Sequence, residues 1–174
     1  SDQMKPSMGR IVSVAVMIAA IILIVSSTLG REIMAGRQPG LWSFSIIHFA
    51  GYLFFLLMPV EALVPYYQAE GHAAIVLVGL SIATAVVAQT IDYGIGRLLS
   101  EQVLRMIGHK KYDRFKGRID RYGGWAIFTF SLLPLSSPNV LLVAGMVRFN
   151  AVYALTISVA GLAAKYLAIV YLFR

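Results

Sequence analysis

Two prolines interrupt the apolar stretch PVEALVPYYQAEG at residues 59–71, and two more interrupt LLPLSSPNVLLVAG at residues 132–145. Proline lacks a backbone N–H and clashes with the preceding helical turn, so each stretch should break a helix in two. Backbone groups freed in this way cannot face lipid and must lie inside protein or beside water. Two broken segments in corresponding halves of a membrane chain are typical of a transport site.

The composition indicates a chain that is dissolved in lipid. Of the 174 residues, 59% are hydrophobic and 13% are charged, whereas a soluble domain has about half apolar and about a quarter charged residues. The absence of cysteine excludes disulfides and thiolate metal sites. The net charge of +7 does not indicate a nucleic-acid partner, because the positive charge concentrates in one segment between apolar stretches, where it sets membrane topology.

Long apolar segments predict the membrane spans. Residues 11–30 carry no charge and are long enough for a first transmembrane helix, since about 20 residues cross the hydrocarbon core. Further full spans are expected over residues 73–96 and 149–172. Residues 1–10 form an N-terminal tail whose first three residues look like a cloning scar, and residues 11–174 form a single membrane domain.

Charge sets the predicted topology. Residues 97–121 contain eight Lys or Arg and three Asp or Glu, a net charge of +5, which predicts a cytoplasmic position. Residues 41–58 could form a full span or half of a re-entrant hairpin. A full span would place residues 97–121 outside, so we favour a hairpin over residues 41–72 that enters from outside. A second hairpin, over residues 125–147, enters from the cytoplasm.

The expected fold class is therefore an all-α integral membrane protein. It has three full transmembrane helices and two opposed re-entrant helical hairpins that meet near the middle of the membrane. A surface amphipathic helix is expected over residues 97–107, where apolar and charged residues alternate at helical spacing. The N-terminus is expected on the cytoplasmic side.

No pattern of a soluble enzyme stands out. The histidines His48, His72 and His109 lack the spacing of metal ligands, and no Gly-x-Ser-x-Gly motif frames a nucleophile. We therefore expect that the protein is not an enzyme and that it uses no cofactor or metal.

Four short motifs suggest a family. They are Glu61 with Pro65 and Glu70, then Tyr93-Gly94-Ile95-Gly96-Arg97, then Tyr122-Gly123-Gly124, and finally Pro134 with Ala144-Gly145 ten residues later. In this order, over about residues 54–170, they make the chain resemble the DedA family, also described as SNARE-associated or VTT-domain membrane proteins.

The resemblance implies a function and also shows departures. Members move lipids between leaflets, as phospholipid scramblases or as transporters of a polyprenyl phosphate carrier, some with proton coupling. The family has arginines where this chain has Ser131 and Ser137, and an acid where it has Gln89, with Asp92 one turn later. The resemblance thus implies a lipid transporter of a bacterial or archaeal cytoplasmic membrane whose grip on a phosphate differs from that of the family.

Four charged residues are candidates for transport or proton coupling. Glu61 lies between two prolines in a membrane segment, where a charge costs about 2.5–3.5 kcal/mol on insertion scales. It should face a cavity, pair with a cation or hold a proton, unless it lies at the interface and faces water. Glu70 and Asp92 have the same two interpretations. Lys165 lies deep in the last span, where pairing with Glu61 or Asp92 would offset its burial, for structure or for transport.

The second break is polar. Its side chains either satisfy backbone groups freed by proline or line a substrate path, and half-helix N-termini there could bind phosphate without arginine. The expected path residues are Pro65, Gln89, Ser131, Pro134, Ser136, Ser137, Pro138 and Asn139. Arg97 and Arg148 are expected to contact a headgroup phosphate, since a guanidinium can bind it with two hydrogen bonds.

The sequence therefore predicts a lipid translocase or scramblase for phospholipid or polyprenyl phosphate. Membrane lipids are the expected partners, with protons and a homo-oligomer left open, and nucleic acid is not expected. The alternatives are a proton- or cation-coupled transporter of a small solute and a membrane scaffold that does not transport.

Overall fold

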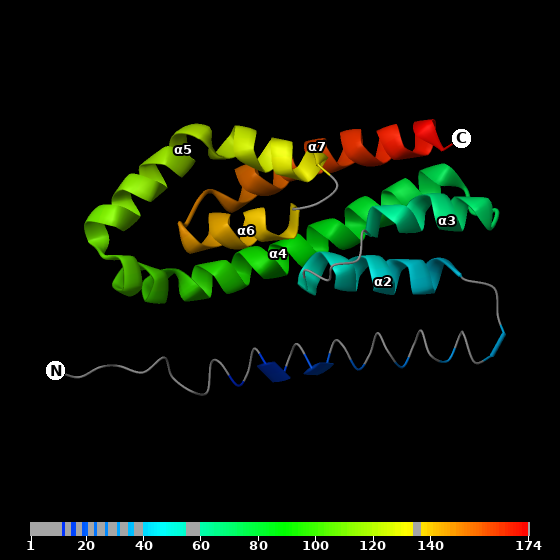
Figure 1. Ribbon diagram of the computed structural model, residues 1–174, viewed down its shortest axis with the longest axis horizontal. Coiled ribbons are helices and arrows are strands. Elements are labelled where there is room, and N and C mark those ends of the chain that lie inside the picture. Colours follow the sequence, from blue (N-terminus) through cyan, green and yellow to red (C-terminus); the bar gives the residue numbers. More distant parts are fainter. Residues whose placement is uncertain are drawn as a thin grey trace.

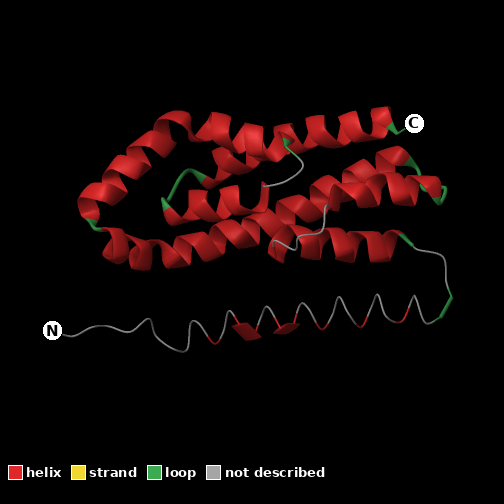
Figure 2. Ribbon diagram, viewed as in Figure 1, coloured by secondary structure: helices red, strands yellow, loops and turns green. Residues whose placement is uncertain are grey.

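The computed structural model describes residues 40–54, 60–133 and 137–173, together with separate positions between residues 12 and 36. In these parts the chain is helical and contains no strand (Figure 2). The predicted first span at residues 11–30 falls largely outside the described residues. The described helices in chain order are α2 (Leu41–Phe54), the short 3-10 helix η1 (Val60–Ala62), α3 (Leu63–Ala69), α4 (Ala74–Ile107), α5 (His109–Leu132), α6 (Ser137–Met146) and α7 (Ala151–Leu172).

Two pairs of helices fold back on themselves. In Figure 1, α2 and α3 run out and back from one end of the molecule, and α5 and α6 do so from the opposite end. The chain reverses direction between α2 and α3 and between α5 and α6, next to the two proline-containing stretches (Figure 1). Pro59 and Pro134 themselves lie outside the described residues. Whether the pairs are re-entrant hairpins depends on a membrane, so that description stays a prediction.

The second proline of each stretch lies where a helix tolerates it. Pro65 is the third residue of α3, and Pro138 is the second residue of α6. In the first turn of a helix the backbone N–H has no partner within the helix, so proline costs little there. The breaks therefore lie before these helices begin, and Pro65 does not break α3.

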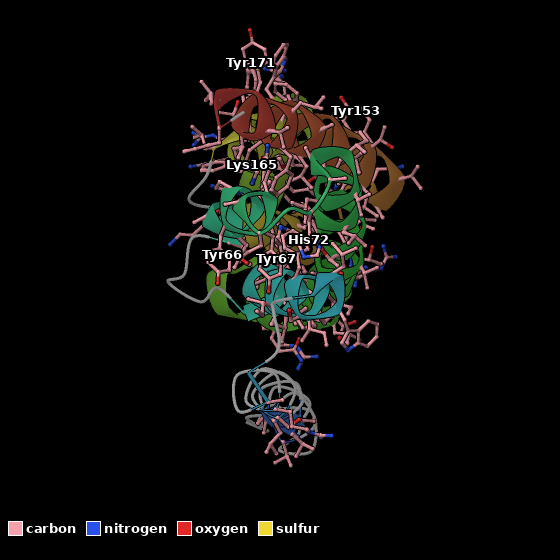
Figure 3. All side chains as sticks on the ribbon, turned by 90° about the vertical axis from the view of Figure 1, so that its right-hand side faces the viewer. Tyr66, Tyr67, His72, Tyr153, Lys165 and Tyr171 are labelled. Carbon is pink, nitrogen blue, oxygen red and sulfur yellow. The ribbon has the colours of Figure 1, made fainter. Side chains whose placement is uncertain are left out.

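Two described helices, α4 and α7, are long and apolar enough to cross a membrane. The apolar segments are Ala74–Gln102 and Ala151–Leu172, which contain most of the predicted spans 73–96 and 149–172. Only 33% and 28% of their most apolar stretches are buried. Large apolar side chains on the outward faces of these helices are exposed, among them Ile75, Val87, Val152 and Leu167, which fits contact with lipid. Figure 3 shows Lys165 inside the bundle, whereas Tyr171, which is 78% exposed, points outward.

The predicted surface helix at residues 97–107 is not a separate element. These residues continue α4 without a break, and α5 likewise runs from His109 through Gly123 and Gly124 instead of starting at residue 125. The sequence has no proline between residues 74 and 132 to end either helix. The chain turns at Gly108, whose φ of +78° favours glycine.

Helices α4 and α6 cross at very short range. A β-carbon added to Gly96 would lie 2.0 Å from the carbonyl oxygen of Leu142, and one added to Gly145 would lie 2.1 Å from that of Tyr93. Small residues at such a crossing let two backbones approach closely, which is a common basis of helix packing in membranes. This crossing fixes α6 against the middle of the molecule.

We expect that Gly96→Ala destabilises the protein, because the new methyl group meets backbone rather than a movable side chain. Overpacking of this kind typically lowers the free energy of unfolding by about 1–3 kcal/mol. Thermal unfolding of the detergent-solubilised full chain would measure the loss.

Gly94→Ala is the matched control, since a β-carbon added there has nothing within 4 Å. It should leave stability unchanged or raise it, because alanine favours helix more than glycine does. Equal unfolding temperatures for the two variants would contradict the close crossing.

Candidate functional site

A buried ion pair joins the first helix pair to the last span. The Nζ atom of Lys165 lies 2.8 Å from Oε1 of Glu61, and the two side chains are 3% and 12% exposed. Lys165 lies seven positions before the end of α7, which is about 10 Å along the helix axis. Of the two partners considered for this lysine, Glu61 and Asp92, the structure selects Glu61.

Local packing brings Glu61 to this position. Glu61 is the central residue of η1, the short helix that follows the interruption after α2. Gly51 of α2 makes room for η1, since a β-carbon there would lie 2.0 Å from Cγ1 of Val60. Lys165 in turn belongs to the inward face of α7, with the buried residues Ser158 and Leu162 before it at helical spacing.

Aromatic side chains surround the lysine. Its Nζ atom donates a hydrogen bond of 2.7 Å to the hydroxyl of Tyr52 and lies 5.1 Å from the ring centroid of Tyr166. Cation–π attraction to the Tyr166 ring adds to the ion pair, more so when water is excluded. The ammonium group therefore has one anionic partner, one hydroxyl partner and one neighbouring aromatic ring.

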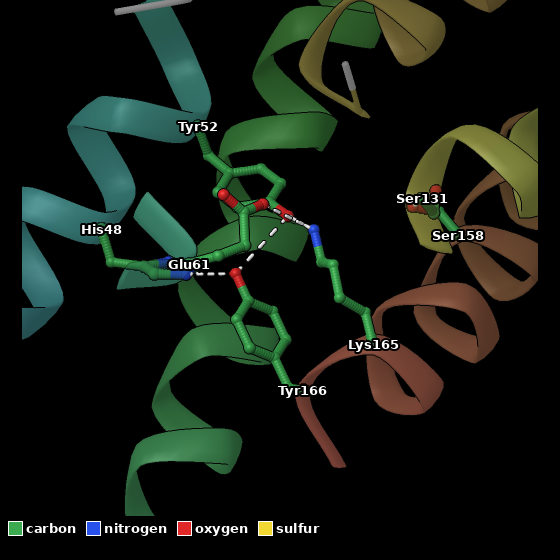
Figure 4. Close-up of polar contacts among 7 residues, drawn as sticks. All are labelled: His48, Tyr52, Glu61, Ser131, Ser158, Lys165 and Tyr166. Atoms are coloured by element: carbon green, nitrogen blue, oxygen red, sulfur yellow. Dashed lines mark hydrogen bonds and ion pairs between the residues drawn. The ribbon is translucent and has the colours of Figure 1, made fainter. Parts of the chain in front are cut away.

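The hydrogen bonds continue beyond the ion pair to α4. The hydroxyl of Tyr166 contacts that of Tyr52 at 3.5 Å and shares a hydrogen bond with Nε2 of His48. The other ring nitrogen of His48 lies 2.8 Å from Oγ1 of Thr84. Figure 4 shows His48, Tyr52, Glu61, Lys165 and Tyr166 converging on one point. We call these five residues and Thr84 the ion-pair cluster.

A second polar cluster connects α4, α5 and α7. The hydroxyl of Ser158 donates to Oε1 of Gln89 at 2.8 Å and lies 2.9 Å from the hydroxyl of Ser131. All three side chains are fully buried. Gly161 permits this approach, because a β-carbon there would lie 2.8 Å from Cβ of Ser131. We call Gln89, Ser131 and Ser158 the serine cluster.

Three buried polar atoms on α4 lack a partner among the described residues. They are Oγ of Ser81, Nε2 of Gln89, which belongs to the serine cluster, and Oδ2 of Asp92, one helical turn after Gln89. Asp92 is 6% exposed. Unpaired buried polar groups are rare in folded proteins, and each one calls for an explanation. A polar path for a substrate is one such explanation.

The other predicted site residues do not join the two clusters in the described structure. Glu70 is exposed at the end of α3, and Pro65 is half-buried in that helix. Arg97 is exposed on α4. Arg148 donates a hydrogen bond from Nε to the hydroxyl of Ser100 at 3.0 Å.

The polar second break is described only in part. Pro134 and Ser136 lie outside the described residues. Ser137, Pro138 and Asn139 begin α6, but their side chains are not described. Within the described residues, no group of three or more His, Asp or Glu side chains could hold a metal ion.

Sequence reasoning missed His48, Tyr52, Tyr166 and Ser158. A weak signal was present, because His48 and Tyr52 are four residues apart and therefore share a face of a helix. Ser158 similarly lies seven residues before Lys165, on the same face of α7. Isolated polar residues at helical spacing in apolar helices thus marked the inward faces.

We expect that Lys165→Met lowers the free energy of unfolding by about 3–5 kcal/mol, because it leaves the buried carboxylate of Glu61 without its cation. The double variant Glu61→Gln/Lys165→Met removes both charges and should regain much of that loss. Thermal unfolding of the solubilised full chain would measure both.

Lys116→Met is the matched control, since Lys116 forms an equally short pair of 2.9 Å with Asp120 but the side chains are 36% and 49% exposed. Exposed pairs contribute about 0–1 kcal/mol. A Lys165→Met variant as stable as this control would show that the buried pair does not hold the helices together.

Apart from His48, both polar clusters lie in a part of the chain that matches a known protein family. The family model of the VTT domain matches residues 50–174, which contain the Glu61–Lys165 pair, the serine cluster and the α4–α6 crossing. Neither the search of curated proteins nor the search of solved structures found a match. Because the match covers more than half of the chain, the protein belongs to the VTT-domain family, the membrane-associated family of the DedA proteins.

Proposed function

We propose that this protein moves a lipid, either a phospholipid or a polyprenyl phosphate, between the two leaflets of a membrane and that protons drive or regulate the movement. The observation that carries the proposal is the buried pair of Glu61 and Lys165. It joins a broken helix to the inside of a helix long enough to span a membrane.

Family membership and the helix arrangement support a membrane transporter. If α4 and α7 cross the membrane, the pairs α2–α3 and α5–α6 become re-entrant hairpins that open at opposite surfaces (Figure 1). The basic residues of 97–121 would then lie in the cytoplasm, together with the ends of α5 and α6 that open there. Opposed broken helices that meet inside the membrane are a known plan for substrate sites.

The depth of the polar clusters supports a path through the membrane. Helix α7 has 22 residues and is therefore about 33 Å long, close to the roughly 30 Å of the hydrocarbon core. Lys165 lies about 10 Å from one end of α7, and Ser158 lies about 10 Å from the other. The two clusters would thus offer a headgroup two polar contacts in succession, one about a third and one about two thirds of the way along α7.

Exchange of partners at the ion pair would link a lipid to a proton. A phosphate oxygen of the headgroup replaces the carboxylate of Glu61 as the partner of Lys165, and Glu61 takes up a proton. The number of unpaired charges in the site does not change, so the exchange avoids the cost of exposing a lone charge to hydrocarbon. The hydroxyls of Ser131 and Ser158 would then offer neutral hydrogen bonds at the next step.

A lipid suits this arrangement better than a small solute, because only its headgroup needs polar partners. The acyl chains can stay outside the bundle, against the exposed apolar faces of α4 and α7. A transporter of a small solute and a scaffold that acts through the basic segment remain as the outcomes that the experiment separates.

The test uses liposomes that contain the folded full chain and either a fluorescent phospholipid or a polyprenyl phosphate, at equal and at opposed pH. We expect leaflet exchange of at least one lipid, at a rate that depends on the pH gradient. Glu61→Gln should lower that rate at least about tenfold, which corresponds to about 1.4 kcal/mol in the barrier, and should remove the dependence on pH.

Asp113→Asn is the control, because it neutralises an exposed acid on α5. It should leave the exchange rate unchanged. No exchange of either lipid by folded protein would reject the proposal, and a solute flux in its place would favour the first alternative. If the rate of leaflet exchange depends neither on the pH gradient nor on Glu61→Gln, lipid movement is supported and proton coupling is rejected. The scaffold is favoured if no transport is seen and if reversing the charges of Lys110 and Lys111 abolishes the binding of a partner.

A further inference from the structure

We infer a second binding site, for the phosphate of an anionic lipid headgroup, at the corner where the α6–α7 link meets α4. Its residues are Arg148 on the link and Arg97 and Arg105 on α4. The inference goes beyond the proposed transport, because it requires only that α4 and α7 cross a membrane. It does not require that any lipid moves between leaflets.

The guanidinium group of Arg148 is held in place with most of its donors unused. Its Nε atom donates to the hydroxyl of Ser100, which is 2% exposed and thus forms a rigid anchor. The closest acid, Glu101, lies 3.9 Å from Nη2, which is too far for a hydrogen bond. The terminal nitrogens donate no hydrogen bond to any described residue, and the side chain is 52% exposed.

The backbone conformation of Arg148 indicates that its guanidinium group has a role. Arg148 has a φ of +55°, the left-handed conformation that glycine adopts most readily at the end of a helix. The amides of Arg148 and Phe149 bond to the carbonyls of Gly145 and Ala144 at 3.0 Å and 2.9 Å, which closes α6 in the usual way. Glycine would serve this closure with less strain, so an arginine here points to a role for the guanidinium group.

Tyrosines keep the link in this conformation. The hydroxyl of Tyr93 donates to the carbonyl of Phe149, and that of Tyr112 donates to the carbonyl of Met146 at 3.1 Å. The link is therefore tied to both α4 and α5, which presents Arg148 in one fixed place. Preorganised donors of this kind bind an anion without the cost of ordering a loop.

The surrounding charge is positive. Arg97 and Arg105 lie four residues before and after Glu101, so all three share one exposed face of α4. Arg105 lies 3.7 Å from Glu101. The backbone of Arg97 also lies beside α6, since its nitrogen would be 3.0 Å from a β-carbon on Gly145. With Arg148 the corner holds three arginines against one glutamate, which leaves positive charge for a phosphate.

The position along the spans selects the lipid headgroup. Arg148 lies three residues before Ala151, where the apolar segment of α7 begins. This is the boundary between hydrocarbon and headgroups, where lipid phosphates lie and attract basic side chains. Lys165 is fourteen residues further along α7, about 21 Å away along the axis, so the corner is separate from the ion-pair cluster.

Native mass spectrometry of the detergent-solubilised full chain would test the site, with dihexanoyl phosphatidylglycerol as the probe. We expect saturable binding that weakens about tenfold in Arg148→Gly, since hydrogen bonds between charged groups are among the strongest in proteins. Glycine suits the φ of +55°, so this variant should unfold at about the wild-type temperature. Arg97→Gln should also weaken binding, and it leaves the link untouched.

Arg118→Gln is the control, because it removes one exposed positive charge from α5, outside the corner. It should leave binding unchanged. Equal binding by wild type, Arg148→Gly and Arg97→Gln would overturn the inference, as would equal weakening by Arg118→Gln. Displacement of the lipid by inorganic phosphate at similar concentration would identify the phosphate alone as the ligand, and failure to displace it would identify the lipid headgroup. Whether the Arg148→Gly variant still moves lipid between leaflets tests the proposed transport. It does not change what the binding measurement says about this second site.

Discussion

The pairing of Glu61 with Lys165 is the interaction on which the arrangement of the interior depends. An unpaired charge in hydrocarbon is costly, and a buried pair is tolerated only where further hydrogen bonds and aromatic faces complete it. Tyr52 and Tyr166 supply these, and His48 links the tyrosines to α4. The partners are 104 residues apart in the chain, so both charges are buried only when η1 packs against α7.

The same principle accounts for the departure of this chain from its family. Ser131 occupies a position where the resemblance leads one to expect arginine, and the structure ties it to Ser158 with a neutral hydrogen bond. The buried cation near the centre comes instead from Lys165 on α7. Lys165 thus supplies a positive group inside the bundle, and at Ser131 the bundle buries a hydroxyl group, which costs less to bury than a charge does.

Several residues that suggested the family turn out to be packing contacts. Gly96 and Gly145 belong to two separate motifs, yet they form one crossing in which α4 and α6 approach backbone to backbone. Tyr93, in the first of these motifs, bonds to the carbonyl of Phe149 beyond the second. These glycines and this tyrosine therefore hold α6 in register with α4. The proposed transport chemistry lies elsewhere, in the Glu61–Lys165 pair and the serine cluster.

Local rules were enough for the apolar helices α4 and α7 and for the expectation that Glu61 needs a partner in the interior, because hydropathy and the cost of a buried charge act within a few residues. The prediction that residues 97–107 form a helix separate from the preceding span was wrong, because these residues continue α4. Periodicity shows which face of a helix is apolar but not where the helix ends. The choice of Glu61 over Asp92 for Lys165, and the recruitment of His48 and Tyr52, required the folded chain. These contacts join residues from helices far apart in sequence, and only the packing of those helices brings the side chains within hydrogen-bonding distance.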